Sequence, residues 1–258
     1  MRITNPNYQK EWFVQKLYGL LYRLENTGDG DFERSGEANF IRNISELYSN
    51  KDFVFFDIGA NNGEYTEMIL RDRPNKISAH LFEPQNSCVF LLKQKFSRNK
   101  NIIINDFGLS DKNETTTLFK DTDQSGFASV YKRDLDYYQI DMNMSETIQL
   151  KNGSDYIEEN KISKIDFIKI DVEGHEMKVF SGLGDYLHPD KIDFIQFEYG
   201  GANLDSHTSL LQIHSLLTKK GFVLCKMMRS SLEIRSYHPR LENFMYQNWV
   251  AVSPKILS

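Results

Sequence analysis

Acidic residues end five segments that have the apolar composition of buried strands. They are Asp57, Glu83, Asp106, Asp171 and Glu198. In an open parallel sheet, ligands bind outside the carboxyl ends of the strands, so these five acids would meet at one rim. A single acid at a strand end usually caps the next helix. Because capping alone seldom needs five acids in succession, the pattern predicts a ligand site.

Two of these acids fit an adenosine. Glu83 lies 20 residues beyond Gly63, where an acid at the end of the second strand suits the ribose hydroxyls. Asp106 ends the third predicted strand, where we expect it to accept a hydrogen bond from the adenine amino group. Phe107 would pack on the adenine ring. The spacing therefore predicts an adenosine-containing cofactor.

The turn after the first strand distinguishes between such cofactors. Residues 59–64 place Asn61 and Glu64 where the dinucleotide fingerprint G-x-G-x-x-G has its second and third glycines. A glutamate would repel a pyrophosphate, whereas S-adenosylmethionine (SAM) has a sulfonium cation and no phosphate. We therefore expect SAM, and an NAD-dependent oxidoreductase is the distant alternative. The residues expected to hold the methionine half of SAM are Asp57, Gly59, Asn61 and Gly63.

The composition is typical of a soluble globular protein. The 258 residues suit one α/β domain with additions, and a hydrophobic content of 40% provides for a large core. A net charge of −5 argues against a nucleic-acid partner. The two cysteines have no metal-binding spacing and fit a reducing cytoplasm. No apolar run approaches the length of a membrane helix, so we expect a cytoplasmic protein without membrane insertion.

The first 50 residues predict a helical cap in front of the main domain. Residues 12–24 carry apolar side chains at helical spacing and indicate an amphipathic helix that needs a partner surface. A second helical pattern covers residues 38–48. We therefore divide the chain into a cap, residues 1–50, and a domain, residues 51–258. Closure of the cap over a ligand and plain packing are both open interpretations.

From residue 53 onward, apolar runs alternate with helical patterns. This alternation indicates an α/β fold with about seven main strands and helices on both faces of the sheet. The last two strands, residues 222–228 and 246–252, follow each other without a helix and must be antiparallel neighbours. Residues 115–119 and 128–131 flank a polar turn and predict a hairpin-like insertion.

Three blocks of the sequence resemble the signature of the FkbM family of SAM-dependent methyltransferases. They are residues 57–63, residues 82–84 and residues 165–176, and the last contains the specific run Asp-Val-Glu-Gly-His-Glu. The similarity covers roughly residues 50–252. The resemblance implies a Rossmann-like, mostly parallel sheet of seven strands in the order 3-2-1-4-5-7-6, with strand 7 antiparallel. It also implies O-methylation, often of sugars or of secondary-metabolite hydroxyls.

Methyl transfer to a hydroxyl requires a group that removes the hydroxyl proton. In the implied strand order, Asp171 ends the strand next to the opening strand and would face both cofactor and acceptor. His175 starts the following helix, whose positive end keeps an imidazole neutral and able to act as a base. Glu198 ends the neighbouring strand and would bind substrate hydroxyls. These three are the candidate catalytic residues.

A divalent metal ion is an open alternative at the same place. Asp171 and Glu198 together would suit Mg²⁺, which prefers carboxylate and water ligands. Some related sugar methyltransferases have a further carboxylate beside the second acid, and Tyr199 occupies that place here. We therefore do not commit to a metal ligand set.

The function predicted from these patterns is SAM-dependent O-methylation of a carbohydrate. The small-molecule acceptor would be a sugar or a sugar nucleotide of surface-polysaccharide biosynthesis. Arg133, Arg229 and Arg235 lie after strands or in insertions, where arginine would suit a phosphate group. The alternatives are a secondary-metabolite hydroxyl and an amine, and an amine acceptor would have little need of a base.

Overall fold

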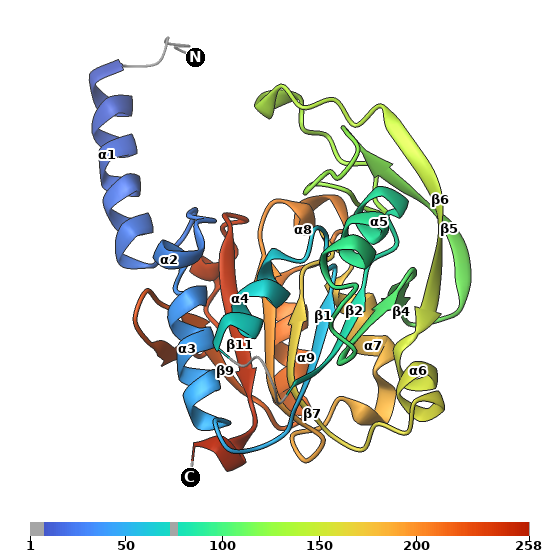
Figure 1. Ribbon diagram of the computed structural model, residues 1–258. Helices are drawn as coiled ribbons and strands as arrows, with labels where there is room; N and C mark the ends of the chain where they lie inside the picture. The colour runs from blue at the N-terminus through green and yellow to red at the C-terminus, as the bar shows by residue number, and fades with distance from the viewer. Residues whose placement is uncertain (1–7, 73–76, 258) are drawn as a thin grey trace.

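Apolar runs form the central strands, as expected for strands that are covered on both faces. In the computed structural model, which describes residues 8–72 and 77–257, these strands pair in parallel (Figure 1). They are β1 (Phe53–Ile58), β2 (Ile77–Phe82), β7 (Ile165–Ile170) and β8 (Ile192–Tyr199). Nearly all of their side chains are buried.

The main sheet has eight strands in the order β10-β9-β11-β8-β7-β1-β2-β3. The other four strands are β3 (Ile102–Asn105), β9 (Val223–Met227), β10 (Leu232–Ile234) and β11 (Gln247–Val252). Without β10, this is the order 3-2-1-4-5-7-6, and β11 runs antiparallel to both of its neighbours. The predicted fold class is confirmed. The strand count needs one correction, because the short β10 pairs with β9 at the sheet edge.

Helices cover both faces of the sheet, and each face has its own apolar core. One face carries α3 (Glu37–Leu47), α4 (Glu64–Asp72) and α5 (Asn86–Lys95), and the other carries α6 (Gly153–Glu159), α7 (Glu176–Gly182) and α9 (Leu210–Lys219). Short helices in the connections are α8 (Ala202–Asp205) and the 3₁₀ turns η1 (Asp136–Tyr138), η2 (Gly184–Tyr186), η3 (Pro239–Leu241) and η4 (Pro254–Ile256).

A second, smaller sheet stands beside the main one (Figure 1). It consists of β4 (Gly108–Ser110), β5 (Glu114–Lys120) and β6 (Met144–Asn152) in the order β4-β6-β5. The predicted hairpin-like contact between residues 115–119 and 128–131 is confirmed only at one antiparallel bridge, where Phe119 and Ser129 exchange two backbone hydrogen bonds. Along its length, β5 pairs instead with β6.

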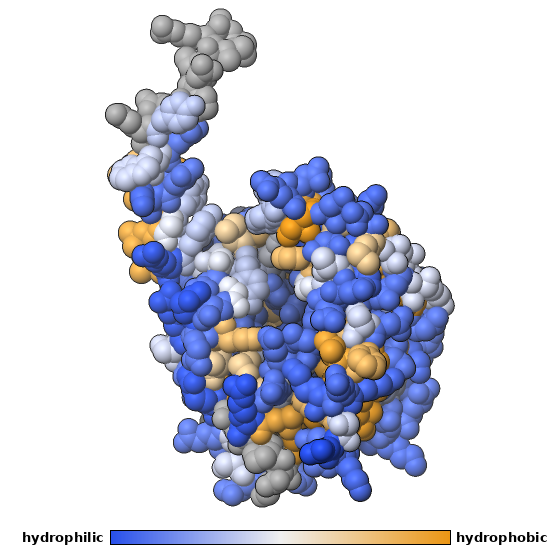
Figure 2. Space-filling view, turned by 45° about the horizontal axis from the view of Figure 1, so that its top comes forward, coloured by the Kyte–Doolittle hydropathy of each residue, from blue (hydrophilic) through white to orange (hydrophobic). Residues whose placement is uncertain are grey.

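The N-terminal helices differ in how they meet the domain. α2 (Phe32–Ser35) and α3 pack on it, and the ring of Phe40 lies edge-on against Phe167 and Phe194. α1 (Tyr8–Leu24) extends away from the domain (Figures 1 and 2), and its apolar side chains are exposed. The partner surface expected for this helix is thus absent from the described part of the chain. The first seven residues of the predicted cap lie outside that part.

The described helices include none that is long and apolar enough to span a lipid bilayer.

A pair of glycine substitutions tests how closely α7 packs on the second sheet. A Cβ atom at Gly182 would lie 1.8 Å from the carbonyl oxygen of Ser110. We expect Gly182→Ala to lower the free energy of unfolding by at least about 2 kcal/mol, because the backbone must shift. The matched control is Gly19→Ala on α1, where nothing lies within 4 Å of an added Cβ.

The measurement is urea unfolding of both variants beside the parent protein. Gly19→Ala removes a flexible residue from a helix interior and should leave the main transition unchanged or slightly raised. Equal midpoints for Gly182→Ala and the parent would show that the contact between α7 and β4 is looser than described.

Candidate active site

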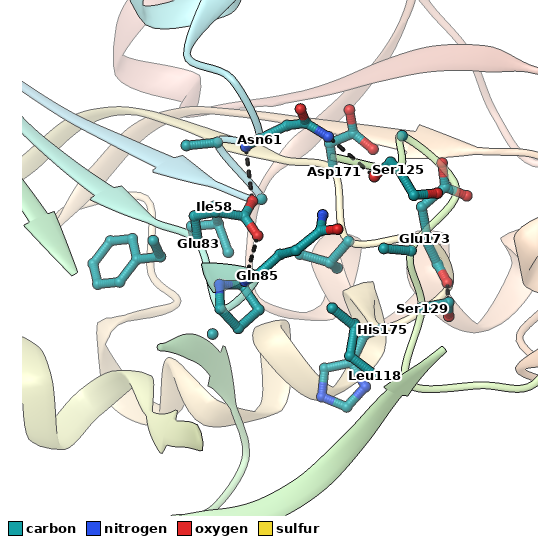
Figure 3. A pocket seen from close by; sticks show the side chains of 18 of the residues that line it. Ile58, Asn61, Glu83, Gln85, Leu118, Ser125, Ser129, Asp171, Glu173 and His175 are labelled. Carbon is teal, nitrogen blue, oxygen red and sulfur yellow. Dashed lines mark hydrogen bonds between the residues drawn. The ribbon is translucent and has the colours of Figure 1, made fainter. Parts of the chain in front are cut away.

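A cleft of about 390 Å³ lies at the carboxyl ends of β1, β2 and β7. Its volume is within the range of small-molecule sites. The turn after β1, the segment after β2 and the loop after β7 form its sides (Figure 3). The second sheet contributes an apolar wall, made by Leu118, Ile148 and Leu150. The cleft is therefore at the rim that the strand-end acids predict.

The turn after β1 is held in a conformation that favours glycine. Gly59 has φ 83°, and a Cβ atom there would lie 1.8 Å from the carbonyl oxygen of Asp171. Asn61 also has a positive φ, 45°, and its side-chain amide donates to the carbonyl oxygen of Ser125 at 3.2 Å. The turn is thus pressed against the strand beside it, and its backbone borders the cleft.

The carboxylate of Glu83 ties the end of β2 to this turn. Its two oxygens accept hydrogen bonds from the backbone N–H groups of Asn61, at 2.7 Å, and Gln85, at 2.8 Å (Figure 3). The side chain is buried and lines the cleft. Burial raises its pKa to about 7, and the two N–H donors oppose that rise. Each oxygen keeps a lone pair for a further donor such as a ribose hydroxyl.

Asp171 follows β7 and forms an ion pair with the buried side chain of Lys169 at 2.8 Å. Burial acts to raise the pKa of Asp171, but the Lys169 ammonium outweighs burial and holds that pKa below its ordinary value. Glu198 lies near the end of β8, the strand that pairs with β7, and is partly exposed. Burial and the charge of Asp171 raise the pKa of Glu198 well above its ordinary value. The pKa values of the two carboxyl groups are therefore shifted in opposite directions.

His175 precedes the first residue of α7 and lines the cleft. One ring nitrogen, Nε2, lies 3.0 Å from the hydroxyl oxygen of Ser110, and Nδ1 lies 3.4 Å from that of Tyr131. Burial lowers the pKa of His175 to about 4, so the imidazole is neutral near pH 7. Neutrality was predicted, but its largest cause is burial. Hydroxyl groups already engage both ring nitrogens.

The loop between Asp171 and His175 is held by Glu173. This residue has φ 47°, and its carboxylate is 2.5 Å from the guanidinium of Arg133. Arg133 also pairs with Asp205 at 3.2 Å. Burial raises the pKa of Glu173 to about 8. Arg133, which was expected to meet a phosphate group, is thus buried between two carboxylates.

The predicted site residues fall into three groups. Those that line the cleft are Gly59, Asn61, Glu83, Asp171 and His175. Two are not among the lining residues: Glu198 lies near the end of β8, and the buried carboxylate of Asp57 accepts a hydrogen bond from Thr66 at 2.5 Å. Gly63, Asp106 and Phe107 face elsewhere.

The expected adenine contacts of Asp106 and Phe107 need correction. β3 ends at Asn105, one residue before the predicted end. The Asp106 side chain is 65% exposed and pairs with Lys93. Phe107 points into the core, where its ring lies against Phe82 and Tyr156. Neither residue lines the cleft. Gly63, with φ 79°, turns toward α5, where an added Cβ would lie 2.7 Å from side-chain atoms of that region.

The alternative of a metal ion gains no support from the geometry. Within residues 8–72 and 77–257, no group of three or more His, Cys, Asp or Glu side chains is arranged to hold a metal ion.

Several cleft residues were not singled out from the sequence. Gln85 follows the Glu83-Pro84 dipeptide and orients the loop of the insertion, since its side-chain oxygen accepts the N–H of Gln124 at 3.1 Å. Ser129 donates its hydroxyl to the carbonyl oxygen of Glu173 at 2.7 Å. Phe32 and Tyr65 come from α2 and α4. Residues 125–129 loosely resemble a segment of the FkbM family, and this resemblance was the available signal for Ser129.

Comparison with known proteins agrees with this site. The sequence model described as "Methyltransferase FkbM domain" matches residues 57–224. Hexuronic acid methyltransferase AglP of Haloferax volcanii is 25% identical over 186 residues, which is 71% of each chain.

Two solved structures share this arrangement more distantly. The methyltransferase FkbM of Methylobacillus flagellatus KT has a TM-score of 0.49 at 15% identity, over 81% of this chain and 47% of that protein. This chain thus spans about half the length of that protein. The M. capricolum protein TrmK, solved with S-adenosylhomocysteine (SAH), has a TM-score of 0.44 at 12% identity, over 83% of this chain and 67% of that protein.

The family match covers well over half of the chain and includes the turn after β1, Glu83 and the loop that carries Asp171 and His175. The chain belongs to the FkbM methyltransferase family and is a SAM-dependent methyltransferase.

Proposed function

We propose that this methyltransferase acts on a hydroxyl group of a carbohydrate. The observation that carries the proposal is the carboxylate of Asp171, which lines the cleft, is 33% exposed and pairs with Lys169 at 2.8 Å, so that it offers a proton acceptor there. A hydroxyl acceptor needs such a group, whereas an amine has a lone pair available without it. The archaeal relative named as a hexuronic acid methyltransferase supports a sugar as the acceptor.

The residues of the cleft fit SAM as the cofactor. Gly59, which has no Cβ atom, lets the turn lie close to the backbone of Asp171 at the edge of the cleft. Glu83 offers carboxylate oxygens to the ribose hydroxyls, and the apolar wall with Ile148 suits an adenine. SAM supplies a methyl group on a positively charged sulfur atom. The acid-rich lining agrees with a cationic cofactor that has no phosphate.

Asp171 is the group best placed to take the proton of the acceptor hydroxyl. Its side chain lines the cleft and is 33% exposed, whereas Glu198 is not among the residues that line the cleft. The Lys169 ammonium holds the pKa of Asp171 below its ordinary value, and burial and the charge of Asp171 raise that of Glu198. A proton that arrives from the acceptor would be shared by the two carboxyl groups. His175 borders the cleft, and we assign it the role of holding Ser110 and Tyr131.

Binding and turnover together test the proposed function. Isothermal titration calorimetry should show binding of SAM and SAH. Mass spectrometry should then show the mass of one methyl group added to a hexuronate-containing saccharide, either free or nucleotide-linked. Methylation of amines but not of any saccharide in the panel would contradict the carbohydrate proposal.

Isosteric substitutions separate the roles of the carboxyl pair. We expect Asp171→Asn to lower kcat by about 100-fold or more, the usual contribution of a general base. Glu198→Gln keeps an N–H donor toward Asp171, so its kcat should stay within about tenfold of the parent value. Steady-state kinetics at saturating SAM gives both values.

The control variant for this pair is His175→Gln, which keeps polar contacts to Ser110 and Tyr131. Its kcat should also stay within about tenfold of the parent value. A larger loss for His175→Gln than for Asp171→Asn would identify the imidazole as the base. Circular dichroism of each variant shows whether the fold is retained.

The titration of Glu83 predicts a pH dependence of cofactor affinity. Its pKa is about 7, and ribose hydroxyls donate to the ionised form. The affinity for SAM should therefore rise about tenfold from pH 6 to pH 8, in proportion to the ionised fraction. Glu83→Gln should bind SAM more weakly, and its affinity should lack this rise. Calorimetry at both pH values for parent and variant measures the difference.

Protein stability should change with pH in the opposite direction. The folded-state pKa of Glu83 is raised above the ordinary value of 4.5, so its contribution to stability is fully present below about pH 4.5. That contribution, about 3 kcal/mol, is lost as the pH rises through about 7. Urea unfolding without cofactor should show that the free energy of unfolding falls less steeply with rising pH in Glu83→Gln than in the parent protein. An identical fall in both proteins would show that Glu83 is not buried in this way.

A further inference from the structure

A buried carboxylate from the N-terminal helices reaches the wall of the cleft. Glu37 is the first residue of α3 and is 2% exposed. Its carboxylate accepts hydrogen bonds from the Ser35 hydroxyl at 2.9 Å and the Gln196 side-chain amide at 2.8 Å. Gln196 in turn accepts a hydrogen bond from the Tyr65 hydroxyl at 2.5 Å. Glu37 lies outside residues 57–224, which the family model matches.

This chain of hydrogen bonds leads to Lys169. The ring of Tyr65 lines the cleft, and the Lys169 ammonium lies 5.1 Å from its centroid. Asp171 forms an ion pair with this ammonium at 2.8 Å. Burial acts to lower the pKa of Lys169, but the charges of Asp171, Asp57 and Glu37 raise it. These carboxylates come from the loop after β7, from β1 and from α3.

The three acids leave an excess of negative charge beside the cleft when all are ionised. Burial raises the pKa of Glu37 and of Asp57, so a further positive charge nearby would favour the ionised form of both carboxyl groups. A cation bound in the cleft would stabilise the ionised carboxylates, and the carboxylates would stabilise the cation. Of two ligands that are otherwise alike, the wall of the cleft thus favours the one that carries an additional positive charge.

SAM and SAH differ by that charge. Both carry the same adenosine, amino and carboxylate groups, but the sulfur of SAM is a sulfonium cation and the sulfur of SAH is neutral. We propose that Glu37, together with Asp57, makes the cleft select the sulfonium cofactor over its neutral product, so that α3 is part of the cofactor site. This inference rests on the proposed binding of SAM in the cleft.

Removal of the charge from Glu37 tests the inference. Calorimetry would measure the Kd of SAM and of SAH for the parent protein and for Glu37→Gln. A glutamine has nearly the same shape and can still bond to Ser35 and Gln196. We expect Kd(SAM)/Kd(SAH) to rise about tenfold in the variant, because the lost attraction acts on the sulfonium alone. The Kd of SAH should change less than about twofold, since SAH lacks that charge.

The matched control is Asp193→Asn. Asp193 is also a buried carboxylate, but it lies at the opposite end of β8, where it bonds to Tyr48 and Lys164. Its loss should lower stability and leave the SAM to SAH ratio unchanged. If Glu37→Gln does not fold, Asp57→Asn removes a charge from the same cluster and should raise the ratio in the same direction.

The outcomes are distinct. If the variants bind SAM and SAH more weakly by the same factor, Glu37 has only a structural role. This result would overturn the inference, while the proposed function would stand. The same ratio change in Asp193→Asn would also overturn it, because a general loss of stability would then explain the result. Absence of SAM binding by the parent protein would refute the cofactor site itself.

Discussion

The ammonium group of Lys169 is the constraint on which the site depends. It is buried at the carboxyl end of β7, and a buried charge is tolerated only with close partners of opposite sign. Asp171 supplies the direct ion pair at 2.8 Å, and the carboxylates of Asp57 and Glu37 add attraction over longer distances. Lys169 thus attracts acids from the loop after β7, from β1 and from α3. The same attraction between Lys169 and the acids contributes to the charge of the cleft wall.

The fold was predictable because its central strands are continuous apolar runs, which parallel sheets covered on both faces require. Strand order came from the resemblance, since local patterns do not specify which strands are neighbours. The same limit explains why β6 was not expected as the partner of β5. Side-chain types in the segment around Thr116 are typical of a strand, but nothing in the local sequence indicates that this strand pairs with β6. β10 has three residues in a polar region and gives almost no pattern.

The strand-end acids predicted the cleft correctly where the strand ends were correct. Glu83 and Asp171 both line it. β3 ends at Asn105, whose side chain is buried, and successive side chains of an extended segment point to opposite sides. Asp106 is consequently exposed, and Phe107 is buried in the core. Glu37 could not have been found from spacing, because its place beside Gln196 results from the packing of α3 on the sheet.

The two carboxyl groups at the cleft resolve an apparent conflict in the role of Asp171. Its pairing with Lys169 keeps it ionised, but a carboxylate with a lowered pKa is by itself a weak base. Glu198 has the opposite property, because burial and the charge of Asp171 raise its pKa. When two such groups share a proton, the proton affinity belongs to the pair and lies between the separate values. In the proposed mechanism, Asp171 would therefore receive the proton at the cleft, and Glu198 would supply the affinity that keeps it.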